Sequence, residues 1–156
     1  MDLKVNFLIE RATNEILAAE SLKKISENPE EKENLNIPEN TTFYSSVISH
    51  AYYAIFYCAK AYLASLKITL PSEQGQHQQV YHKFKQLVNN GSLEKELLNI
   101  YEGIRIKAEE LLEILWNEKI KRNTYTYKTL PQANKEPAND SLNNAKIFIS
   151  HIKALL

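Results

Sequence analysis

The scarcity and the placement of glycine and proline constrain the fold of this chain more than any other feature of its sequence. Three glycines and five prolines among 156 residues leave little of the turn chemistry that a many-stranded sheet requires. Because proline interrupts the hydrogen-bond ladder of a helix, the long segments without proline are the expected helices. All five prolines fall in expected connections, at Pro29, Pro38, Pro71, Pro131 and Pro137.

Apolar residues recur at steps of three and four along every long segment, which is the period of one helix face. The sequence predicts helices over residues 3–26, 42–67, 76–89, 92–121 and about 140–156, with loops over 28–40 and 129–139. The expected N-caps are Thr41 or Thr42 for the second helix, Ser92 for the fourth, and Asp140 or Ser141 for the last. The second helix is apolar over most of its circumference, so it should be central. We therefore expect an all-α, antiparallel four- to five-helix up-and-down bundle, forming a single domain over residues 1–156.

The balance of charge excludes one class of function. The chain carries 19 basic and 19 acidic residues, so it lacks the overall positive field that draws a protein onto nucleic acid regardless of sequence. A single cysteine, Cys58, cannot form an internal disulfide and suits a reducing compartment. The N-terminus lacks the apolar core of a signal peptide, and no run approaches the roughly 20 apolar residues that span a bilayer. We expect a cytoplasmic protein with no membrane partner and only local contacts to nucleic acid.

The stretch from Arg122 to Tyr127 is the strongest candidate for a binding site. The Arg122 guanidinium can hold a phosphate through two parallel N–H donors. Asn123 places an amide beside it, and Tyr125 and Tyr127 can donate a hydrogen bond or stack on a base. These four residues are the predicted contacts to a nucleotide or an RNA phosphate.

Two further ligand-binding candidates, His50 and Tyr53, lie in the expected central helix. Each also has a structural interpretation, because a helix of this kind accommodates a satisfied core histidine and packs tyrosine rings with wet hydroxyls. His77 and His82 are five residues apart and do not share a helix face, so they do not predict a metal site. No metal or other cofactor is expected.

Four segments in chain order carry a resemblance to a known family. The segment 46–63 resembles the Tyr-Tyr-Ala-x-Phe-x-x-Ala-Lys-Ala-Leu helix of HEPN-domain proteins, and His77 with Phe84 resembles their His-x6-Phe segment. The segment 91–97 resembles their linker into a long helix. The arginine motif, Arg122-Asn123 with Tyr127, resembles the Arg-Asn-x-x-x-Tyr form of some members. The resemblance covers nearly the whole chain. It implies an antiparallel helical bundle that forms homodimers, with two copies of the arginine motif in one cleft. Arg105 offers a competing alignment, but only Arg122 has the asparagine and tyrosine partners.

One departure from the family bears on catalysis. Members that act as metal-independent endoribonucleases carry a histidine separated from the arginine by four to six residues, and here Tyr127 occupies the first such position, with no histidine at the other two. Thr126 also replaces an acidic residue found in many members. Imidazole, with a pKa of about 6.5, exchanges a proton near neutral pH, whereas a phenol with a pKa of about 10 does not. Arg122 and Tyr127 are therefore the candidate catalytic residues, but Tyr127 is a poorer base than the histidine that it replaces. The sequence leaves open whether the protein is an enzyme.

The resemblance implies a nucleotide- or RNA-phosphate-binding homodimer that pairs with a minimal nucleotidyltransferase as a toxin–antitoxin system, because that partner is often encoded next to family members. Two alternatives stay open. One is a metal-independent endoribonuclease with a non-standard proton carrier, such as His50 from a facing helix. The other is a non-catalytic protein-interaction module.

Overall fold

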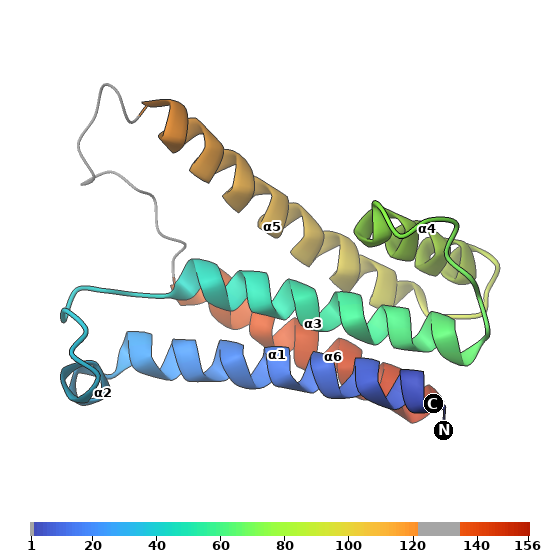
Figure 1. Cartoon of the computed structure of the whole chain (residues 1–156), viewed down its shortest axis with the longest axis horizontal. Helices are drawn as coiled ribbons and strands as arrows, with labels where there is room; N and C mark the ends of the chain where they lie inside the picture. The colour runs from blue at the N-terminus through green and yellow to red at the C-terminus, as the bar shows by residue number, and fades with distance from the viewer. Residues whose placement is uncertain (1, 122–134) are drawn as a thin grey trace.

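The computed structural model describes residues 2–121 and 135–156, and the stretch 112–121 through its backbone alone. All regular structure in these two ranges is helical, which confirms the predicted all-α class. The helices are α1 (Leu3–Glu27), α2 (Pro29–Asn34), α3 (Tyr44–Ser65), α4 (Gln76–Asn89), α5 (Lys95–Lys121) and α6 (Lys135–Leu155). In Figure 1 the long helices α1, α3, α5 and α6 alternate in direction along the chain, and both termini lie at the same end of the bundle. The up-and-down arrangement is therefore as expected.

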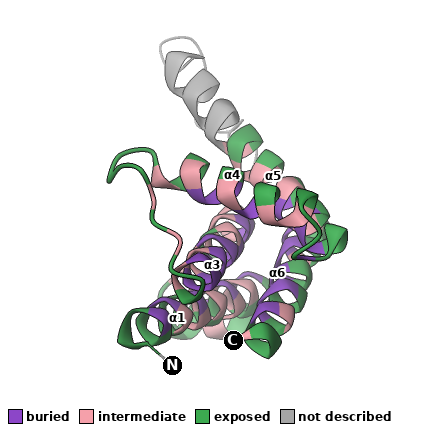
Figure 2. Ribbon diagram, turned by 90° about the vertical axis from the view of Figure 1, so that its right-hand side faces the viewer, coloured by how far each residue is buried: buried purple, intermediate pink, exposed green. Residues whose placement is uncertain are grey.

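Helix α3 is the centre of the bundle, as its apolar circumference predicted. It packs against α1, α4, α5 and α6, and the α1 contact is the most extensive. Small residues make the close approach of α1 possible, since Ala12, Ala51 and Ala54 are fully buried. Figure 2 shows the buried sides of α3 and α6 turned toward the interior.

The segment 28–40, predicted as a loop, contains the short helix α2, so that prediction was wrong in part. The Asn28 side chain accepts hydrogen bonds from the backbone N–H groups of Glu30 and Glu31, and Pro29 occupies the first helical position. Proline is well suited to that position because its missing N–H would have no partner there. The two glutamates also lie in the first turn, where the helix dipole favours negative charge.

Two predicted N-caps were also wrong. Helix α3 begins at Tyr44, with Phe43 rather than Thr41 or Thr42 at the N-cap position. The Phe43 N–H donates to the Ser26 hydroxyl at the end of α1, 2.7 Å away, so a contact between helices fixes this start. Helix α5 begins at Lys95, and Ser92 instead donates its hydroxyl to the Asn90 side chain within the preceding turn.

Helix α6 begins at Lys135, several residues before the predicted Asp140 or Ser141 cap. Pro137 lies in its first turn, where proline does not interrupt a hydrogen bond. The early start is supported by tertiary contacts, because Ala138 is fully buried and the Lys135 ammonium lies 3.7 Å from the Glu27 carboxylate at the end of α1. The segment 135–139 was therefore wrongly predicted as a loop.

An aromatic cluster joins α4, α5 and α6 and so positions the elements that build the candidate site. The Phe84 ring lies 5.5 Å from Tyr101 and 5.3 Å from Phe148, measured between ring centroids. All three side chains are completely buried. Aromatic rings in such tilted contacts stabilise a core beyond the area that they bury, and here they hold α4 against the side of the bundle.

Candidate functional site

A pocket of about 300 Å³ opens between α3, α4 and α5. Its volume lies at the small end of the range for ligand pockets in proteins. The wall combines aromatic rings, one cation and one carboxylate, with residues from all three helices: Ser49, Tyr52, Tyr53, His77, Arg105, Ala108 and Glu109. The pocket therefore brings an arginine and several aromatic rings to a common cavity.

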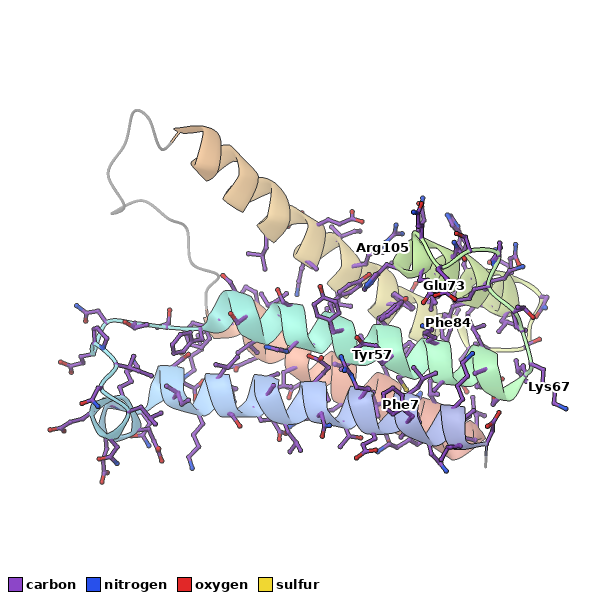
Figure 3. The ribbon with its side chains drawn as sticks, viewed as in Figure 1. Phe7, Tyr57, Lys67, Glu73, Phe84 and Arg105 are labelled. Carbon is purple, nitrogen blue, oxygen red and sulfur yellow. The ribbon has the colours of Figure 1, made fainter. Side chains whose placement is uncertain are left out.

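Arg105 supplies the positive charge of the pocket. Its guanidinium carbon lies 4.1 Å from the centroid of the Tyr81 ring, and its Nε lies 3.4 Å from the Glu109 carboxylate one turn further along α5. Figure 3 shows Arg105 between α5 and the start of α4. The Tyr81 hydroxyl donates to Glu102, which holds the ring beneath the guanidinium. The stacking on Tyr81 and the ion pair with Glu109 limit the rotamers of Arg105, so the position of its guanidinium is set before a ligand binds.

His77, in the first turn of α4, forms the opposite part of the wall. Its ring stacks on Phe56 at 3.9 Å between centroids, with 16° between the planes. Its Nδ1 shares a hydrogen bond with the Tyr52 hydroxyl, at 3.0 Å. Partial burial and the positive charge of Lys60 lower the pKa of His77 below its usual value. The imidazole is therefore neutral at neutral pH.

Tyr52 and Tyr53 extend the aromatic surface from α3. The Tyr53 ring meets His77 edge-on at 5.6 Å and is 40% exposed, so part of its face is open to solvent. Burial raises the pKa of Tyr52, which keeps its hydroxyl protonated and able to share a hydrogen bond with His77. Tyr53 is thus a predicted binding residue that the fold places in the pocket.

The fold places His50, the other candidate from α3, away from this pocket. Its Nδ1 lies 2.5 Å from the Glu15 carboxylate of α1. Arg11, also on α1, lies 4.0 Å from Glu15 and donates to the Tyr57 hydroxyl at 2.9 Å. Figure 3 shows Tyr57 on the side of α3 that faces α1, away from Arg105. His50 therefore belongs to a polar cluster between α1 and α3.

The remaining predicted site residues, Arg122, Asn123, Tyr125 and Tyr127, lie outside the described residues. Three of the pocket residues were passed over at the sequence level. Arg105 was named only as a second alignment of the arginine motif, Tyr52 was not among the predicted contacts, and His77 was named in the family resemblance but not as a ligand contact. The resemblance of His77 and Phe84 to a family segment was the one signal that pointed to His77.

The fold and the pocket define a small all-α bundle with a cationic, aromatic cavity on its side. The sequence matches the HEPN domain family over residues 19–155, from within α1 to the last residue of α6. The chain belongs to the HEPN family, and this membership supports a function connected with nucleotides or RNA. No curated protein and no solved structure matches it.

The described residues contain neither a membrane-spanning helix nor a cluster of metal ligands. None of the helices there is long and apolar enough to cross a membrane. No group of three or more histidine, cysteine, aspartate or glutamate side chains in those ranges is arranged to hold a metal ion.

Proposed function

We propose that this protein binds a nucleotide, or a single nucleotide of an RNA strand, in the pocket between α3, α4 and α5. The observation that carries the proposal is the presence of a guanidinium and three aromatic rings in one cavity. Arg105 neutralises the phosphate through charge-assisted hydrogen bonds. The base stacks on the exposed face of Tyr53 or against the neighbouring rings, a contact worth about 1 to 3 kcal/mol per base. Glu109 is 63% exposed and pairs with Arg105, so it exchanges this partner for water when a phosphate binds.

The three arginines of the chain make a matched test. We expect Arg105→Ala to weaken binding of a fluorescent nucleotide or short oligoribonucleotide by about 1 to 3 kcal/mol, because it removes hydrogen bonds between charged groups. Arg11→Ala is the control, since Arg11 also lies over a tyrosine ring, at 4.8 Å from Tyr57, and also has a glutamate partner four residues on. Both variants lose similar local contacts, but only Arg105 lines the pocket. Fluorescence anisotropy measures the affinities.

Arg122→Ala forms the third arm, because the arginine motif remains a proposed phosphate contact. Weaker binding in Arg122→Ala but not in Arg105→Ala would move the ligand to the motif and contradict the assignment to the pocket. Equal loss in Arg105→Ala and Arg11→Ala would indicate a general effect of charge. Absence of binding by the wild type would favour the protein-interaction module.

We propose a homodimer as the state in which the protein acts. Two features support it: α5 diverges from α3 along its length (Figure 1), and Ile106 on α5 is 54% exposed. A second copy would cover apolar surface of this kind through a self-complementary interface. Light scattering is expected to give twice the 18.0 kDa mass of one chain at micromolar concentration.

Ile106→Glu should shift the protein toward the monomer, because it places a charge in the interface. The fold should persist, since the side chain is exposed in the single chain and exposed substitutions usually change stability by less than about 0.5 kcal/mol. A wild type that stays monomeric would remove the dimer from the proposal and leave the pocket of the single chain unaffected.

The pairing with a nucleotidyltransferase antitoxin also remains a proposal, and the resemblance of the four sequence segments is what supports it. Identifying the product of the adjacent gene is the direct test. A neighbour unrelated to nucleotidyltransferases would count against the pair.

A further inference from the structure

A groove runs along the outside of the bundle between α1 and α6. Two adjoining cavities of about 290 Å³ and 360 Å³ form it, and Lys146 of α6 lines both. Its walls extend over residues 13–27 of α1 and 139–153 of α6, and each wall is about 20 Å long at a rise of about 1.5 Å per residue. Figure 2 shows both helices on the side of the bundle away from α4. The groove is therefore separate from the pocket of Arg105, to which neither helix contributes.

The groove has a surplus of positive charge, although the formal net charge of the whole chain is zero. Four lysines and two glutamates line it: Lys23, Lys24, Lys146, Lys153, Glu20 and Glu27. Each glutamate already has a lysine partner. The Lys153 ammonium instead lies 3.4 Å from the Thr13 hydroxyl, and no carboxylate of the described residues pairs with it. Four lysines against two glutamates leave two positive charges for a partner to neutralise.

Apolar side chains border the groove on both walls. Leu17 is 54% exposed on α1, and Ile147 is 42% exposed on α6. Each is four residues from one lining residue of its own helix and three from another, a spacing that places all of them on one helix face. These lining residues are Thr13 and Glu20 on α1, and Asn143 and Ser150 on α6. The floor between the walls is also apolar, because Ile16 and Ile149 form part of it.

This composition favours a helix over a nucleic acid strand as the occupant of the groove. Proteins that hold a single strand combine cations with aromatic rings on which the bases stack, and the described residues that line the two cavities include no aromatic ring and no arginine. An apolar floor between rows of lysines matches the apolar stripe of an amphipathic helix with acidic flanks. A wall of about 20 Å accommodates a helix of about 14 residues.

We propose that the groove between α1 and α6 binds an acidic amphipathic helix of a partner protein. The apolar stripe of that helix covers Leu17 and Ile147, and the acidic side chains on its flanks pair with Lys153 and the other lysines of the groove. The apolar contacts supply most of the binding free energy, and the charges decide which partner binds. The inference does not depend on the proposed function, because the groove and the nucleotide pocket share no residue.

The test uses a labelled synthetic peptide of about 14 residues, with leucines at helical spacing, glutamates on both flanks and alanines elsewhere. Fluorescence anisotropy is expected to show saturable binding to the wild type. Lys146→Glu combined with Lys153→Glu should weaken this binding by about tenfold or more, since each reversal turns an attraction into a repulsion. Lys85→Glu combined with Lys95→Glu is the matched control, because both lysines are exposed and lie outside the groove.

A second peptide, with lysine in place of every glutamate, provides a rescue. It should bind the variant with Lys146→Glu and Lys153→Glu better than it binds the wild type, which also shows that this variant is folded. Equal binding of the two peptides to the wild type, or no binding of the acidic one, would overturn the inference. So would a groove variant that loses affinity for a single-stranded oligoribonucleotide but not for the acidic peptide, because the groove would then hold nucleic acid. Arg105→Ala should leave peptide binding unchanged, so a loss of nucleotide binding alone concerns only the proposed function.

Discussion

Replacement of Phe84 by alanine is expected to lower the free energy of unfolding by about 3 to 5 kcal/mol, the usual cost of removing a buried phenylalanine side chain. Phe84 is completely buried, and its ring contacts Tyr101 of α5 and Phe148 of α6. The substitution would leave a cavity and remove the aromatic contacts of Phe84 with α5 and α6. Because α4 carries His77, we also expect weaker nucleotide binding. Denaturation by urea, followed by circular dichroism, measures the loss of stability.

Phe7→Ala is the matched control for Phe84→Ala. Phe7 is 59% exposed on α1, and Figure 3 shows it on the outside of the bundle, away from Phe84. The same chemical change there should alter stability by less than about 0.5 kcal/mol. Equal effects of the two substitutions would contradict the packing of α4 against α5 and α6.

Ala145→Glu is the second substitution with a large expected effect, about 3 to 5 kcal/mol, because it leaves a buried charge without a partner. Ala145 on α6 is completely buried in the same core cluster as Phe148 and Ile149. A carboxylate there either stays ionised at a high desolvation cost or takes up a proton and still disrupts the packing. The expected readout is loss of the cooperative thermal transition.

The neighbouring residue provides the control for Ala145→Glu. Asn144 is exposed on the same helix, so Asn144→Glu introduces the same side chain into solvent, and the thermal midpoint should change little. A stable Ala145→Glu protein would mean that α6 does not pack against α3 as described.

Elements with a strong internal period could be predicted from the sequence. The range predicted for α4, 76–89, agrees with the structure, and the central position of α3 followed from its apolar circumference. The failures lie at the ends of helices. Helix α3 begins where Ser26 of α1 binds the Phe43 N–H, and α6 begins early because Ala138 is buried. The local sequence pattern shows neither the hydrogen bond from Phe43 to Ser26 nor the burial of Ala138.

For the candidate site, too, the sequence indicated what lies within one segment and missed what distant segments bring together. The sequence pointed to Arg122 because an amide and phenols stand beside it in the chain, and those residues lie outside the described structure. The pocket at Arg105 had no such signal, because Tyr52, His77 and Arg105 come from three helices. Tyr53 was predicted as a binding residue and lies in the pocket, whereas His50, on the same helix, pairs with Glu15 of α1.

By itself the sequence determined a helical bundle with α3 at its centre, because apolar period and proline placement act within each segment. Its four motif segments carried the resemblance to the HEPN family. Only the tertiary structure decided which side chains share a cavity. A helix face is defined by residues three and four apart, but its neighbour depends on how distant segments pack. That packing places His77 of α4 beside Tyr52 of α3, and both in the pocket of Arg105.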